Sequence, residues 1–220
     1  MTRPTRWLTG LFLVLAAFAA NAGVVYDNGV AAVNDAFYSD RGIPLVSADD
    51  FALAAGANTI NGIRWSGIYA FANTPPATDA FRIEIFADNG GTPADGPPLI
   101  AIDVGGGNRA DSGVDLVGYD VYSYHAAIAP LTLAANTTFW LSISNDTSAD
   151  GDDDWFWGAG ATPGNSFAGP DEETTWIPIG FNHDFLLTGV PEPATVVLAG
   201  LGLAGLGFTA GRRAKRAWPG

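Results

Sequence analysis

The stretch NDTSADGDDDWFWGAG, residues 145–160, places acidic and aromatic side chains next to one another. Five aspartates fall within nine residues around Gly151 and repel one another unless their charge is compensated. A hard divalent cation, which prefers oxygen ligands, would relieve that repulsion. The alternative is a solvated acidic loop without a metal. The predicted Ca²⁺ ligands are Asp146, Asp150, Asp152 and Asp154.

The spacing of these acids mimics the first nine positions of an EF-hand loop. Position twelve of such a loop is Trp157 here, where an EF-hand has a bidentate glutamate. The surrounding sequence also has no helical period on either side. An EF-hand is therefore excluded, and a calcium-holding loop between strands remains the prediction.

The aromatic residues after the acids suggest a second kind of site. In a strand, Trp155 and Trp157 share one face and Phe156 takes the other. If the two indoles are exposed, they form a platform on which a sugar ring can stack, and Trp140 is a third candidate. Alternatively these faces fill the core, as aromatic side chains commonly do in β proteins. Phe156 is expected in the core.

Catalytic chemistry finds little support in the sequence. His125 and His183 are the two histidines, and no G-x-S-x-G, H-E-x-x-H or P-loop motif occurs. His183 precedes Asp184, but neighbouring strand residues face opposite ways. Glycoside hydrolysis needs a positioned carboxylate pair, which a chain this acidic can provide by chance. The sequence predicts no enzyme, with a polysaccharide hydrolase as the lesser alternative.

Short alternating segments must position these residues. AFRIEIFAD alternates Phe81, Ile83 and Ile85 with polar residues, and TTFWLSISN follows the same period of two. Loops rich in Gly, Pro, Asn and Asp separate about nine to eleven such strands, and no helical period appears in the body. The predicted fold is all-β, a two-sheet antiparallel β-sandwich of jelly-roll type, with a barrel or β-helix as alternatives.

Charge and composition narrow the function further. The body, residues 23–189, keeps four arginines against 22 acidic residues, a formal charge of −18. Such a body is repelled by phosphate backbones, so nucleic-acid binding is not expected. The chain has no cysteine, which excludes disulfides and thiolate chemistry.

The two ends look like targeting segments. Residues 1–22 combine a basic start, an apolar run and Ala-Asn-Ala, which predicts a signal peptide cleaved between Ala22 and Gly23 by the secretory route. Residues 194–211 contain no charge and, as a helix, would span about 27 Å, enough to cross a membrane. The basic cluster 212–216 would stay cytoplasmic. We therefore expect a signal helix before the sandwich and a transmembrane helix after it.

The tail VPEPATVVLAGLGLAGLGFTAGRRAKRA resembles a PEP-CTERM sorting tail, with the signature at Pro191, Glu192 and Pro193. The resemblance covers residues 190–220 and implies recognition and cleavage by a membrane-embedded exosortase in a Gram-negative, exopolysaccharide-producing host. More loosely, segments such as IRWSGIYAFANTPPATDAFRIEIFADNGGTP resemble exported PEP-CTERM proteins whose body is a β-sandwich of unknown role.

These features together predict an exported protein that starts as a membrane-anchored precursor and reaches the cell surface or extracellular matrix. The expected partners are the secretory translocon, the exosortase and an extracellular polysaccharide, bound without catalysis and with Ca²⁺ as a possible cofactor. The alternative is a structural acidic matrix protein without a specific ligand. A polysaccharide hydrolase is the second alternative.

Overall fold

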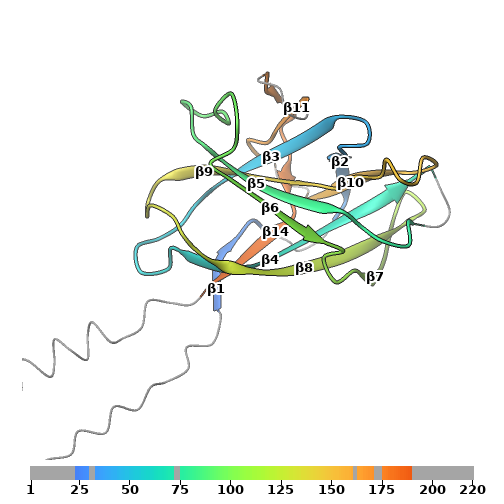
Figure 1. Ribbon diagram of the computed structural model, residues 1–220, viewed down its shortest axis with the longest axis horizontal. Coiled ribbons are helices and arrows are strands. Elements are labelled where there is room, and N and C mark those ends of the chain that lie inside the picture. Colours follow the sequence, from blue (N-terminus) through green and yellow to red (C-terminus); the bar gives the residue numbers. More distant parts are fainter. Residues whose placement is uncertain (1–22, 30–32, 72–74, 161–162, 171–174, 190–220) are drawn as a thin grey trace, which may run out of the picture.

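The computed structural model describes residues 23–29, 33–71, 75–160, 163–170 and 175–189. These residues form 14 strands in two antiparallel sheets and contain no helix (Figure 1). The prediction of an all-β chain with two antiparallel sheets is confirmed. The predicted signal peptide and the tail 190–220 lie outside the described residues.

Within the described part of the chain, no helix has the length and apolarity needed to cross a membrane. The predicted span 194–211 is not in that part.

Sheet A has eight strands arranged around β4, the central strand. On one side β4 pairs with β8, and β8 pairs in turn with β7. On its other side β4 pairs first with β14 and then, further along, with β10. The outer partners are β1 beside β14, and β2 and β13 beside β10. The strands are β1 (Gly23–Asp27), β2 (Asp35–Tyr38), β4 (Thr59–Ala70), β7 (Ala110–Leu116), β8 (Tyr119–Thr132), β10 (Asp154–Gly160), β13 (Asn182–His183) and β14 (Phe185–Gly189).

Sheet B has six strands in the order β12-β11-β3-β9-β5-β6. In Figure 1 its strands β3, β9 and β5 lie above β4, β8 and β14 of sheet A. The strands are β3 (Leu45–Ala52), β5 (Phe81–Ala87), β6 (Ile100–Gly105), β9 (Thr138–Ser144), β11 (Phe167–Pro170) and β12 (Ile177–Pro178).

The core fills the space between the two sheets. The alternation predicted for β5 and β9 is present, because Ile83, Ile85, Leu141 and Ile143 all point into it. Sheet A contributes mainly aromatic rings, and one of them, Trp155, packs edge to face on Phe81 of sheet B at 5.0 Å between ring centroids. The sheet A aromatic residues in this core are Trp65, Tyr69, Tyr124, Trp155, Trp157 and Phe185.

Gly67 shows how closely the indole of Trp155 lies against β4. A Cβ at this position would stand 2.5 Å from the Phe156 carbonyl oxygen and 2.6 Å from Cζ2 of Trp155. Only glycine leaves room for that ring, so residue 67 fixes which face of β10 turns inward.

The first and last described strands pair, with Gly23 opposite Gly189. The predicted signal-cleavage position and the start of the sorting tail therefore adjoin the same edge of sheet A. Any membrane attachment through the tail would hold the sandwich from this edge.

Candidate functional site

The two tryptophans of β10 are buried, which corrects the expectation that they form an exposed platform. Trp155 and Trp157 are both 0% exposed. Trp157 stacks on the His183 ring at 4.3 Å between centroids, and its Nε1 donates a hydrogen bond to the Asp184 carbonyl at 2.9 Å. Phe156, expected in the core, instead points outward from β10. The alternation was predicted correctly, but the inward face was assigned to the wrong residues.

Trp140 is also buried, at 1% exposure, although it lies on the outer face of sheet B. A small second cluster covers it there, with Phe167 at 5.2 Å between ring centroids. Its Nε1 donates to Asp88 Oδ1 at 2.9 Å. Phe167 lies on the short strand β11, which carries no apolar alternation in the sequence, so this cover could not be foreseen. None of the three indoles offers a face to a sugar.

The four predicted calcium ligands do not point to one centre. Asp146 accepts a hydrogen bond from the backbone N–H of Ser148 at 3.0 Å, and the Ser148 side chain, followed by this N–H, lowers its pKa. The pKa of Asp150 is raised by its neighbour Asp152, and Asp154 lies on the outward face of β10. Among the described residues, no group of three or more His, Cys, Asp or Glu side chains is set to hold a metal ion. Calcium binding stays a prediction.

Asp153, which was not among the predicted ligands, is the unusual acid of this loop. It is 3% exposed, and neither carboxylate oxygen has a hydrogen-bond partner. Burial, followed by the charges of Asp150 and Asp152, raises the pKa of Asp153 to about 6. Asp40, buried nearby, accepts hydrogen bonds from Thr147 Oγ1 at 2.7 Å and from the Trp155 N–H at 2.8 Å, which ties the loop to the sandwich.

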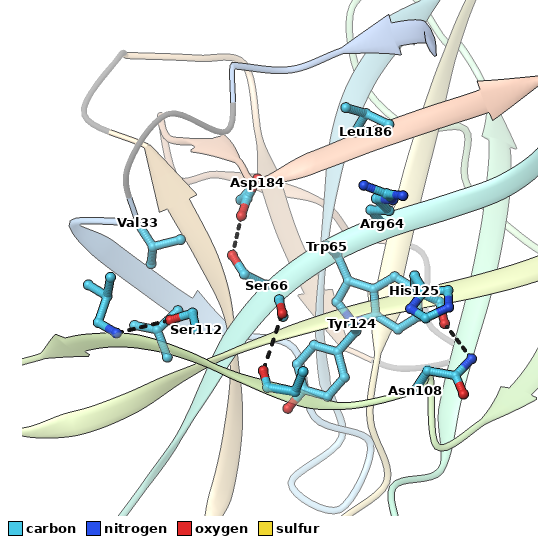
Figure 2. Close-up of a pocket in the computed structure, with 14 residues that line it drawn as sticks. Val33, Arg64, Trp65, Ser66, Asn108, Ser112, Tyr124, His125, Asp184 and Leu186 are labelled. Atoms are coloured by element: carbon cyan, nitrogen blue, oxygen red, sulfur yellow. Dashed lines mark hydrogen bonds between the residues drawn. The ribbon is translucent and has the colours of Figure 1, made fainter. Parts of the chain in front are cut away.

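A groove of about 550 Å³ lies on the outer face of sheet A (Figure 2). Its floor consists of outward side chains that are cross-strand neighbours: Arg64 opposite His125, and Ser66 opposite Ser123. Strand β7 and Val33 form its walls. The lining is Val33, Arg64, Trp65, Ser66, Asn108, Ala110, Ser112, Val114, Val121, Ser123, Tyr124, His125, Asp184 and Leu186.

The groove contains an unpaired charged group, although several of its other polar groups bond one another. Arg64 is exposed, and of the four arginines in the described part of the chain it alone makes no ion pair or hydrogen bond. His125 is exposed beside it, and the Asn108 side chain donates to the His125 carbonyl at 3.3 Å. Apolar side chains, such as Val114 and Leu186, complete the lining.

Asp184 closes one end of the groove floor. Ser66 Oγ donates a hydrogen bond to its Oδ2, while its Oδ1 has no partner (Figure 2). Burial raises the pKa of Asp184 to about 6. His183 points the other way into the core, where burial lowers its pKa to about 3. The two residues therefore do not form a base and its orienting acid, as their adjacent positions in a strand already suggested.

A second depression, of about 980 Å³, lies beside β6 and β8. Its arginine, Arg109, is already engaged: Nη1 bonds Asp79 Oδ1 at 3.0 Å and Nη2 bonds the Pro76 carbonyl at 2.8 Å. Small residues make up much of the rest of its lining. The groove on sheet A holds the unpaired Arg64 and is the better candidate site.

The groove was not predicted from the sequence because its parts are far apart in the chain. One signal was present: GIRWSGIYAF alternates Arg64 and Ser66 with Trp65 and Gly67, which marks a polar outward face. The same period of two in β8 puts Ser123 and His125 outward. That these faces adjoin follows only from the pairing of β4 with β8.

The PEP-CTERM protein-sorting motif matches residues 189–214. The chain carries a PEP-CTERM sorting motif. The match includes the Pro-Glu-Pro signature predicted at residues 191–193. The motif implies an exported, membrane-anchored precursor that is processed by an exosortase.

Two solved structures are similar to the body, both at 10% identity. One contains the cysteine protease and lectin-like domains of Cwp84, a surface layer associated protein of Clostridium difficile, with a TM-score of 0.42 over 67% of this chain and 32% of that chain. The other is clostridial Cwp84 after propeptide cleavage, with a TM-score of 0.44 over 72% of this chain and 38% of that chain. At these TM-scores neither likeness bears on function. The comparison with curated proteins finds no match.

Proposed function

We propose that the mature protein is a non-catalytic module of the cell surface or extracellular matrix that binds an extracellular polysaccharide in the groove of sheet A. The sorting motif, which implies export and exosortase processing, supports this location. The observation that carries the proposal is the groove itself, an open site of about 550 Å³ lined by both polar and apolar side chains.

The chemistry of the lining suits a sugar. Each sugar hydroxyl both donates and accepts hydrogen bonds, and the groove presents hydroxyls at Ser66, Ser112 and Ser123, together with the guanidinium of Arg64. Apolar walls complement the C–H faces of the sugar ring, and a few convergent polar groups then set its orientation. Since Arg64 is unpaired, binding a ligand breaks no ion pair at this position.

The number of acidic residues in the groove favours glycan binding over glycan hydrolysis. A glycoside hydrolase needs two carboxylic groups on either side of the scissile bond. Of the described residues that line the groove, Asp184 is the only acid, and its Oδ2 is bonded to Ser66. The module therefore holds a glycan without cleaving it.

Affinity electrophoresis tests this function. The full chain, kept in a non-ionic detergent without a sugar headgroup, is run through native gels that contain Ca²⁺ and a panel of neutral or uronic acid-bearing polysaccharides. We expect at least one polysaccharide to retard it. Ser123→Trp, which fills the groove, should remove the retardation, whereas Ala129→Trp, on an exposed part of the same strand outside the groove, should not.

Three results would contradict the proposal. Free migration in every gel would favour a structural acidic matrix protein. Equal retardation of the two tryptophan variants would move the site away from the groove. Release of reducing ends from the retarding polysaccharide would indicate a hydrolase.

A further inference from the structure

We propose that Tyr38, Phe71 and Phe156 form an aromatic platform that stacks on a neutral pyranose unit of the same glycan, so that the ligand is a chain of several sugars. This inference rests on the proposed function of the groove. It adds a second contact point on the outer face of sheet A and specifies the sugar that binds there. The sequence suggested such a platform at Trp155 and Trp157, with a place in the core as the alternative, and both indoles are buried.

The three rings gather at the outward end of β10. Phe156 points away from the core, and Tyr38 is its cross-strand neighbour on β2, with 3.9 Å between ring centroids. Phe71, directly after β4, lies 6.0 Å from Phe156 at an interplanar angle of 62°. Tyr38 and Phe156 are half-buried, and Phe71 is 65% exposed.

The backbone of Phe71 supports a functional role for its ring. Its φ is 81°, in the left-handed region, where the Cβ of a bulky residue clashes with the neighbouring backbone. An exposed phenylalanine gains no core packing that would offset this cost. Residues held in strained backbone conformations cluster at active sites and ligand-binding sites. Phe71 therefore retains an unfavourable conformation that presents its ring beside Phe156.

One row of cross-strand neighbours links the platform to the groove. Cross-strand pairing across sheet A places Ile68 of β4 between Phe156 of β10 and Val121 of β8, all on the outer face. Val121 already lines the groove. Ile68 and Val121 are themselves buried, at 4% and 3% exposure, so a glycan chain bound at Ser123 would reach the aromatic rings by passing beside this row.

The surroundings of the platform select a neutral sugar. Burial, followed by the charge of Asp154 on the outward face of β10, raises the pKa of the Tyr38 phenol. The carboxylates of Asp150 and Asp152 precede Asp154 in the same loop. These charges repel a uronate, while Asp154 can accept hydrogen bonds from sugar hydroxyls. The C–H groups on one face of a pyranose carry partial positive charge and stack on the negative face of an aromatic ring.

The test compares Phe71→Gly with a matched control, Val117→Gly. Val117 is also an exposed apolar residue with positive φ, at 52°, but it lies in the turn between β7 and β8 and does not line the groove. Glycine takes positive φ without a steric cost, so both variants should melt at a higher temperature than the wild type. Only Phe71→Gly should weaken glycan binding, by about tenfold.

The full chain is tested in the same detergent, with the polysaccharide that retards it and with its oligosaccharides of two to eight units. The wild type should bind the longer chains more tightly than the disaccharide, and Phe71→Gly should reduce this preference. Undiminished binding by Phe71→Gly would overturn the platform and leave the groove intact. Failure of every polysaccharide to retard the wild type would overturn both. Dissociation of a ligand-free dimer by Phe71→Gly, seen by sedimentation, would identify the rings as a self-association surface and overturn the platform.

Discussion

The body should become more stable on acidification from pH 8 to pH 5, because buried carboxylates must be ionised at the higher pH. Asp49 is the main cause. Its side chain is fully buried, and burial raises its pKa to about 7, although its Oδ2 accepts hydrogen bonds from Asn28 Nδ2 at 2.9 Å and from the His183 N–H at 2.5 Å. In the unfolded chain Asp49 stays ionised down to about pH 4.

The sign follows from proton binding. Between these two pKa values the folded state binds more protons than the unfolded state, so stability rises as pH falls. At about 1.4 kcal/mol per pH unit, Asp49 contributes roughly 3 kcal/mol between pH 7 and pH 5. Asp153 and Asp184, with pKa values raised to about 6, act in the same direction. His183 acts oppositely, since its pKa is lowered to about 3 and the unfolded imidazole takes up a proton below about pH 6.5.

The opposing contribution of His183 at pH 5 is roughly 2 kcal/mol, so the net gain from pH 8 to pH 5 is on the order of 3 kcal/mol. Urea unfolding of residues 23–189, which contain both sheets and the core, measures it through tryptophan fluorescence at the two pH values. Asp49→Asn cannot titrate and should reduce the gain by roughly 3 kcal/mol. Lower stability at pH 5, or an unchanged pH response in Asp49→Asn, would refute the reasoning.

Two further predictions concern the acidic and aromatic segment 145–160. Trp157→Ala should lower the free energy of unfolding in urea by about 3–5 kcal/mol, because the substitution leaves a cavity at a fully buried site beside His183. If the variant keeps wild-type stability but loses glycan binding, the indole is exposed and this expectation is wrong. The Tm should be higher in millimolar Ca²⁺ than in a chelator, because a cation would pair with the carboxylate of Asp153, which has no hydrogen-bond partner. Asp153→Asn should reduce this difference in Tm. Superimposable melting curves of the wild type with Ca²⁺ and with chelator would contradict calcium binding.

Strands with a clear apolar alternation could be predicted from the sequence. β5 and β9 appear where Phe81, Ile83 and Leu141 indicated, because each buries one face against the other sheet. β7 was not predicted, because its residues are mostly exposed and show no apolar alternation. In the structure it pairs only with β8. An edge strand that buries little leaves no hydrophobic pattern to detect.

The candidate site was harder to predict, because alternation tells which residues share a face but not which face turns inward. For β10 that choice depends on Gly67, which admits the Trp155 ring against β4. Glycine at a distant position carries no visible link to residue 155 in the sequence. The groove likewise depends on strand pairing between segments about 60 residues apart, as between Arg64 and His125.

Hydroxyl-radical footprinting of the full chain, with and without the polysaccharide that retards it, tests the central claim most directly. The account predicts protection of His125 and Leu186 in the groove and of Phe71 on the platform. Leu99 and Ile177 serve as internal controls, because both are exposed on the side of sheet B and should react equally in the two samples. Protection of Leu99 or Ile177 with unchanged reactivity at His125 would contradict a glycan site on sheet A.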